Sequence, residues 1–268
     1  MEHITRGRLA ALVFALGTAV LATTAVGATD VTDIGTLDQN ILGSIPAFQS
    51  ATRQLQQYGA TLQKQYLGRA QHASQSDQAK LAQEFQGKMA DKQRQLVAPL
   101  MRKAQIAVAS VASSKNLTVV LDKRMVVVGG TDITNNVRDL LTGIGDPVPP
   151  VSTPPPSTVG YVDQQAIDAT PKVKSANDDF LSFKNQQDKA FSDKLKAAHN
   201  DADRDAVLKD YRKTLDDRQN TTLKPVIDQT RSAISDVAKQ KGLVLVVDRA
   251  DIIYGGTDIT NDVTAKLK

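Results

Sequence analysis

Apolar residues recur every three or four positions along one long stretch in each half of the chain. In the first half they are Phe48, Ala51, Leu55, Tyr58 and Leu62, and in the second Val173, Ala176, Phe180 and Phe183. This spacing gives one apolar stripe per helix, as in coiled coils. A second stripe follows in each half, at Leu81–Val111 and Leu208–Val237. The polar stretches between them contain good helix caps, Ser76 and Asn200, so each half is predicted to form an antiparallel helical hairpin.

Short β-type runs flank each predicted helical hairpin. DIGTLD (Asp33–Asp38) and TVGYVD (Thr158–Asp163) precede it, whereas LTVVLD and LVLVVD follow it. We expect the later runs to begin β-hairpins that return through VVV and DIIY to a Gly-Gly pair. The predicted fold class is α+β, mainly α. Each half has a small β-body (a strand plus a β-hairpin), a long coiled-coil hairpin of helices and a short C-terminal helix.

The two halves are copies of each other. GGTDITN occurs at Gly129–Asn135 and again at Gly255–Asn261. Around it, 11 of the 22 positions from Leu117 to Arg138 are identical to their counterparts in Leu243–Thr264. Agreement at a fixed offset over this length indicates a tandem duplication.

Eight residues are predicted to have structural roles. Each Gly-Gly pair ends a strand with a turn of unusual backbone angles, and the threonine that follows caps the last helix of its half. A proline inside the second arm helix of each half is expected to kink that helix. A phosphate-binding glycine loop is the alternative for the repeated string, but it lacks the G-x-G-x-x-G pattern and a P-loop lysine. The eight residues are Pro99, Pro225, Gly129, Gly130, Thr134, Gly255, Gly256 and Thr260.

The chain begins with a segment unlike the rest. Arg6 and Arg8 precede an apolar run from Leu9 to Ala28, the pattern of a secretory signal peptide, here with cleavage near Ala28. An uncleaved membrane anchor is the alternative. The predicted organisation is a signal peptide at 1–28, a first repeat at 29–142, a linker at 143–158 and a second repeat at 159–268. The linker holds six of the ten prolines and is expected to be extended, so it can separate the repeats and does not force them together.

Composition and charge argue against several classes of function. The chain has no cysteine, which excludes disulfides and a lipidated cysteine, and its aromatic content is only 4%. Residues 29–146 carry 13 Lys/Arg against 10 Asp/Glu, and residues 147–268 carry 18 against 18. This balance argues against a nucleic-acid partner. His72 and His199 fall at the predicted hairpin tips without other metal ligands nearby, and the carboxylates of DADRD (Asp201–Asp205) lack the Gly and Glu of a calcium loop.

The order of elements resembles the Skp/OmpH family of periplasmic chaperones. The resemblance is carried in the second half by VGYVD, by LKPVIDQTRSAISDVAKQKGLVLVVD and by DIIYGGTDITNDV. IGTLD and LDKRMVVVGGTDITNNV carry it more loosely in the first half. It implies a periplasmic protein whose helical arms hang from a β-body assembled from three units. Because this chain holds two units, the resemblance leaves open a trimer with two bodies or an intrachain pseudo-dimer.

The resemblance implies a holding chaperone without enzymatic activity, catalytic residues, cofactor, metal or ATP. Its partners are unfolded outer-membrane or exported proteins, held between the arms and near the membrane surface. The alternative is a structural spacer or envelope-organising protein that binds one fixed partner through its coiled-coil faces. Apolar residues off the predicted stripes are the candidates for client contact, although they also suit packing against a neighbouring helix. They are Tyr66, Leu67, Val97, Met101, Leu181 and Phe191.

Overall fold

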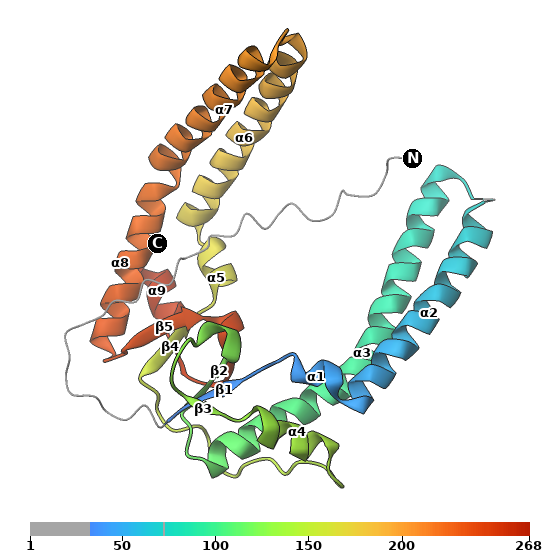
Figure 1. The fold of residues 1–268 in the computed structure, drawn as a ribbon, viewed down its shortest axis with the longest axis vertical. Coiled ribbons are helices and arrows are strands. Elements are labelled where there is room, and N and C mark those ends of the chain that lie inside the picture. Colours follow the sequence, from blue (N-terminus) through green and yellow to red (C-terminus); the bar gives the residue numbers. More distant parts are fainter. Residues whose placement is uncertain (1–32, 72) are drawn as a thin grey trace.

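The computed structural model describes residues 33–71 and 73–268, so the predicted signal peptide and His72 lie outside the described residues. Figure 1 shows two helical arms that diverge from a small body of β-strands. The first arm is formed by α2 (Pro46–Ala70) and α3 (Gln75–Ser114), and the second by α6 (Pro171–Ala197) and α7 (Asp201–Thr222). This arrangement confirms the predicted mainly helical α+β class. None of the helices in the described ranges has both the length and the apolarity needed to cross a membrane.

Local signals set the ends of the arm helices. α2 and α6 begin at Pro46 and Pro171, where a proline loses no helical hydrogen bond. At the second tip, the Asn200 side chain accepts a hydrogen bond from the backbone N–H of Asp203 at 2.8 Å, as the sequence predicts. At the first tip, the cap is Ser74 instead of the predicted Ser76, which lies one residue inside α3.

The two prolines have different surroundings. α3 runs unbroken through Pro99, and Figure 1 shows that this helix changes direction along its course. In the second repeat the helix ends at Thr222, and α8 (Lys224–Gln240) begins after Leu223 with Pro225 in its first turn. The prediction that Pro225 lies inside a kinked helix is therefore wrong. Pro225 lies in a first turn, where no intrahelical donor is required.

Each repeat contributes a small parallel β arrangement. β1 (Ile34–Leu37) lies between β2 (Val119–Asp122) and β3 (Thr131–Asp132), parallel to both. In the second repeat β4 (Val159–Val162) lies in the same way between β5 (Leu245–Asp248) and β7 (Thr257–Asp258). Parallel neighbours need a long crossover connection, and the helical arm supplies it between β1 and β2 and between β4 and β5.

The predicted β-hairpins are not formed within a repeat. Short 3₁₀ turns at Lys123–Met125 and Arg249–Asp251 follow β2 and β5. The aspartate just before each turn, Asp122 or Asp248, accepts a backbone N–H from it. After the second turn, β6 (Ile252–Gly255) leaves its own repeat and pairs antiparallel with β2 of the first. The equivalent segment 126–129 forms no strand in the described structure. Strand pairing thus joins the repeats into a four-stranded sheet, β3-β1-β2-β6.

The repeats share a core as well as a sheet. Val119, Leu121, Val159 and Ile252 form one buried apolar cluster that draws on both repeats. The end of the linker is fixed there, because Thr118 donates from its Oγ1 to Oγ of Ser157 at 3.1 Å and Thr257 donates to the Ser157 carbonyl at 3.0 Å. The two repeats therefore meet in one sheet, although the proline-rich linker could separate them. A semi-rigid linker limits reach, but strand pairing and apolar burial decide whether the ends meet.

The repeated GGTDITN string fastens the last helix of each repeat to the sheet. All four glycines have positive φ, from 67° to 91°, as predicted. Asp132 and Asp258 accept the backbone N–H groups of Thr134 and Thr260, both at 2.9 Å. The predicted threonine caps are therefore wrong, because the aspartate two residues earlier supplies the side-chain oxygen.

The two threonine hydroxyls bond across the fold instead. Thr134 accepts from the backbone N–H of Asp38 at 3.0 Å, and Thr260 accepts from that of Asp163 at 2.9 Å. Each bond ties α4 (Thr134–Thr142) or α9 (Thr260–Lys266) to the end of the central strand, just before α1 (Ile41–Ser44) or α5 (Gln164–Asp168). The isoleucine before each threonine is fully buried in the core of its repeat.

Candidate functional site

The two arms project away from the β-body (Figure 1), and the packing between their helices decides which side chains stay exposed. In the first arm, Leu62, Leu81 and Phe85 are buried between α2 and α3, with Tyr58, Tyr66 and Met89 packed around them. The rings of Tyr66 and Phe85 meet edge to face with centroids 5.6 Å apart. The predicted stripes therefore face each other, as in a coiled coil.

The second arm repeats this aromatic pair with the residue types exchanged. Phe191 and Tyr211 correspond to Tyr66 and Phe85 in the repeat alignment, and their ring centroids lie 4.5 Å apart. The Tyr211 hydroxyl donates to the carboxylate of Asp188, which also accepts from Lys184 at 2.7 Å. The hydrogen bond to Asp188, together with burial, raises the pKa of Tyr211 to about 12. Hydrogen bonds from Lys184 and Tyr211 lower the pKa of Asp188.

An ion pair joins the two helices of each arm at equivalent positions. Arg69 contacts Glu84 at 3.1 Å in the first arm, and Lys194 contacts Asp210 at 3.0 Å in the second. Hydrogen bonds from Lys88 and Arg69 lower the pKa of Glu84. The four paired side chains are between 39% and 61% exposed, so these pairs contribute little free energy and mainly favour one register of the helices.

A cation over an aromatic ring also occurs at equivalent places. Lys92 lies 5.8 Å from the centre of the Tyr58 ring, and Arg218 lies 5.1 Å from that of Phe183. Such contacts contribute about 0.5–1 kcal/mol at exposed sites. Comparison of the two halves residue by residue is the sequence signal that would have found both these contacts and the ion pairs.

The six client-contact candidates differ in how exposed their side chains are. Tyr66 and Phe191 are half-buried and pack against an aromatic ring of the neighbouring helix, which matches the alternative of helix packing. Val97 is half-buried. Three candidates are exposed and belong to the arm helices: Leu67, Met101 and Leu181.

The arms differ in charge. Residues 46–98 carry seven Lys/Arg against three Asp/Glu, whereas residues 171–222 carry eleven against ten. The first arm is therefore basic, and the second is almost neutral but densely charged. A surface of scattered apolar side chains among charges of both signs suits many weak contacts with an extended chain better than one rigid ligand.

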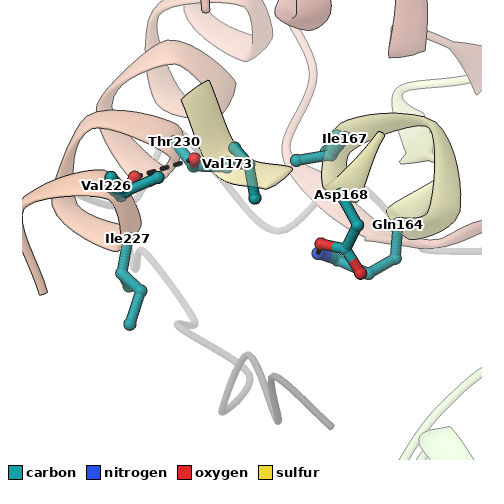
Figure 2. A pocket seen from close by; sticks show the side chains of 7 residues that line it. All are labelled: Gln164, Ile167, Asp168, Val173, Val226, Ile227 and Thr230. Atoms are coloured by element: carbon teal, nitrogen blue, oxygen red, sulfur yellow. Dashed lines mark hydrogen bonds between the residues drawn. The ribbon is translucent and has the colours of Figure 1, made fainter. Parts of the chain in front are cut away.

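The best-formed hollow in the described residues is too small for a ligand. It lies between α5, α6 and α8, as Figure 2 shows, and offers about 10 Å³. That space is at the lower limit for one water molecule. Oε1 of Gln164 is buried there without a hydrogen-bond partner, while its Nε2 donates to Asp168 at 2.8 Å.

The strand-ending aspartates Asp122 and Asp248 each accept a backbone hydrogen bond from the 3₁₀ turn that follows. Asp122 is buried and accepts from Nη2 of Arg124 at 2.6 Å and from Nε2 of Gln39 at 3.0 Å. The hydrogen bond from Arg124 lowers the pKa of the Asp122 carboxyl. Asp248 lies in the other sheet, where its carboxylate accepts the backbone N–H of Ala250. No group of three or more potential metal ligands occurs among the described side chains.

Comparison with protein families identifies one model that matches the chain twice. The family described as outer membrane protein (OmpH-like) matches residues 47–141 and again residues 163–267. The two matches cover most of the chain and correspond to the two repeats. No curated protein and no solved structure matches the chain.

Proposed function

The chain belongs to the OmpH-like family, whose members are periplasmic chaperones of the Skp type, and from this premise we propose that it is an ATP-independent holding chaperone. Its clients are unfolded outer-membrane or exported proteins, which it holds between its two arms in the periplasm. Residues 1–28 act as the signal peptide in this proposal, residues 29–142 and 159–268 are the two chaperone units, and residues 143–158 are the linker.

The single observation that carries this proposal is the pair of diverging helical arms on one β-body (Figure 1). Each arm packs an aromatic pair between its own two helices, so this packing does not depend on contacts with the other arm. An unfolded chain lying between the arms can contact both at once. Linked weak contacts of this kind raise the overall affinity well above that of one contact.

The exposed apolar side chains on the arms supply the hydrophobic part of client binding. Leu67 and Leu181 lie on α2 and α6, and Met101 lies on α3. Burial of a large apolar side chain against a client is worth about 1.5–3 kcal/mol. The excess of positive charge on the first arm favours clients with acidic segments, and this contribution weakens as salt rises.

The direct test is suppression of aggregation. An unfolded outer-membrane β-barrel protein is diluted from urea into buffer without ATP, with and without the purified chain, and light scattering is recorded. We expect suppression at roughly stoichiometric ratios of chain to client. Absence of suppression with several β-barrel clients would contradict the proposal.

Matched variants localise the binding surface. The double variant Leu67→Gln/Leu181→Gln removes exposed apolar surface from both arms and is expected to raise the chain concentration needed for half-suppression several-fold. The control is Val148→Gln/Val151→Gln, which removes exposed apolar residues from the linker instead. Equal loss in both variants would show that client binding is not confined to the arms.

Recovery of partners separates this function from a structural spacer. A chaperone is expected to be recovered with many unfolded proteins, whose yield falls when export of outer-membrane proteins is stopped. Recovery of one folded protein at constant yield would favour the spacer.

A further inference from the structure

Two carboxylates from different repeats lie at one end of the contact between β6 and β2, the joint between the repeats. The antiparallel register pairs Leu121 with Ile252, so the next residues, Asp122 of the first repeat and Asp251 of the second, lie at the same end of the joint. Asp122 is almost fully buried, and Asp251 is half-buried. Like charges that face each other across paired strands destabilise the pairing. Negative charge therefore gathers at the point where the two repeats meet.

The cations around Asp251 are bonded to other groups. Arg124, whose charge acts on Asp251 across the joint, is bonded to Asp122 through Nε at 3.1 Å and Nη2 at 2.6 Å. The Arg124 side chain is 72% exposed, so water screens much of its attraction for a second carboxylate. Lys123 contacts Asp132 at 2.7 Å, and Arg249 donates from Nη1 to the Ile252 carbonyl at 3.0 Å while lying over the Tyr161 ring.

The Asp251 carboxylate itself receives no hydrogen bond from the described residues. Asp248, on the same turn, adds a further negative charge and uses its own carboxylate to accept the backbone N–H of Ala250. Burial and the charges of Asp248 and Asp122 raise the pKa of Asp251, and the charge of Arg124 opposes them. The charged form of Asp251 is thus disfavoured where β6 meets β2.

The first repeat shows how the equivalent turn neutralises its charge. Arg124 corresponds to Ala250, and Met125 corresponds to Asp251. The first turn therefore pairs its strand-ending aspartate with an arginine and has an uncharged third residue. The second turn has an alanine in place of that arginine and a carboxylate as its third residue. The two repeats thus differ in charge at the turn that leads into β6.

We propose that Asp251 makes the joint sensitive to acid: β6 holds β2 more tightly when the Asp251 carboxyl is protonated and less tightly when it is charged. The sign follows from the raised pKa, because a carboxyl that is easier to protonate in the closed joint stabilises that joint as the pH falls. This gain is complete below the ordinary aspartate value of about 4 and is lost as the pH rises through the pKa of Asp251 in the closed joint.

Asp122 limits the response on the acid side. The hydrogen bond from Arg124 lowers the pKa of Asp122, so the stabilisation from this carboxylate is present above about pH 4 and is lost as the pH falls further. The two carboxyls therefore act in opposite directions on either side of this value. The joint is expected to be tightest near pH 4 and to loosen towards neutral pH.

Loosening of the joint changes how the repeats are held together. Ile252 of β6 is buried with Val119, Leu121 and Val159 in the cluster shared by both repeats, and the backbone N–H of Gly256 donates to the Thr118 carbonyl at 3.2 Å. These contacts weaken when β6 moves away from β2, whereas the packing inside each arm does not involve them. The pH then alters the freedom of one arm relative to the other without unfolding either arm. This inference is independent of the proposed chaperone function.

Hydrogen exchange measures the opening of the joint directly. Exchange of the backbone amides of residues 252–256 is followed by mass spectrometry in the full chain at pH 5 and at pH 7. Each observed rate is compared with the rate of an unprotected amide at the same pH, which gives a protection factor. We expect this protection factor to be several-fold higher at pH 5 than at pH 7, with a smaller change for the amides of α2.

Two variants assign the response to Asp251. Asp251→Asn removes the charge, and Ala250→Arg supplies the second turn with the arginine that the first turn has. Both are expected to raise the protection factor of residues 252–256 at pH 7 towards the wild-type value at pH 5 and to remove most of its pH dependence. The control is Asp193→Asn, at an arm position that is 80% exposed, and it is expected to behave as the wild type.

Circular dichroism at both pH values checks that each variant is folded. Two results would each overturn the proposal. One is a wild-type protection factor for residues 252–256 that does not change between pH 5 and pH 7. The other is a pH dependence that persists unchanged in folded Asp251→Asn and Ala250→Arg chains, which would assign the response to another group.

Discussion

The arm of the first repeat is held together by apolar side chains, whereas the arm of the second relies partly on a hydrogen bond to a carboxylate. Phe85 is buried between α2 and α3, but its counterpart Tyr211 is half-buried and donates to Asp188. No residue of α7 is fully buried. The ion pairs and the cation–π contacts nevertheless stand at equivalent positions in both arms.

This difference teaches that the shape of the arm and its stability are set by different features. Contacts at fixed positions along the hairpin align the two helices, and they tolerate exchange of lysine for arginine or phenylalanine for tyrosine. The free energy comes mainly from apolar area removed from water. The first arm fully buries Leu62, Leu81 and Phe85, whereas no residue of α7 is fully buried. We therefore expect the second arm to open more readily than the first.

The largest expected effect on stability concerns the GGTDITN segment of each repeat, where the two repeats are most alike. Ile133→Ala and Ile259→Ala remove fully buried side chains from the repeated string, and each is expected to destabilise the protein by about 2–5 kcal/mol. Urea unfolding followed by circular dichroism measures both, with the exposed-site variant Leu67→Ala as control, expected within about 0.5 kcal/mol of wild type. Clearly unequal losses in the free energy of unfolding would show that the GGTDITN segments of the two repeats do not contribute equally to stability.

A smaller effect separates the arms. Phe85→Ala opens a cavity in the first arm and is expected to cost about 3 kcal/mol, whereas Phe191→Ala, at a half-buried position, is expected to cost about 1–2 kcal/mol. Hydrogen exchange of the backbone amides in α2 and α6 reports the opening of each arm separately. In the wild type, slower exchange in α6 than in α2 would contradict the ranking.

The smallest effect is a pH dependence confined to the second arm. Because the folded-state pKa of Tyr211 is raised to about 12, its bond to Asp188 stabilises the arm below about pH 10, and this contribution is lost as the pH rises towards 12. The lowered pKa of Asp188 gives a contribution present above about pH 4 and lost as the pH falls further. Tyr211→Phe is expected to cost about 1 kcal/mol at pH 7 and to remove the alkaline dependence.

Unfolding midpoints of wild type and Tyr211→Phe between pH 7 and 11 check this prediction. Tyr66→Phe is the matched control, since Tyr66 has no carboxylate partner in the described structure. An alkaline loss of stability that persists unchanged in Tyr211→Phe would assign the effect to another group.

Several features of the fold followed from the sequence alone. The stripes ending in Leu62 and beginning at Leu81 predicted two helices and the face on which they meet, because side-chain direction along a helix repeats locally. The Gly-Gly pairs predicted unusual backbone angles because glycine adopts positive φ at little cost. Internal repetition predicted two copies of one architecture. Each of these signals lies within a few residues or in direct comparison of the two halves.

The sequence did not determine which strands pair. Several segments have residues suited to strands, namely β2, β5, β6 and segment 126–129. Strands are joined by backbone hydrogen bonds, and nearly every residue type carries the same backbone donor and acceptor, so the sequence does not specify the partner. Only the tertiary structure showed that β6 crosses to the other repeat while Val127 and Val128 stay in water. The same holds for the hydroxyl of Thr134, which bonds to Asp38, 96 positions away, instead of capping its own helix. Local chemistry fixed the elements, and competition among distant partners for burial and hydrogen bonds fixed their assembly.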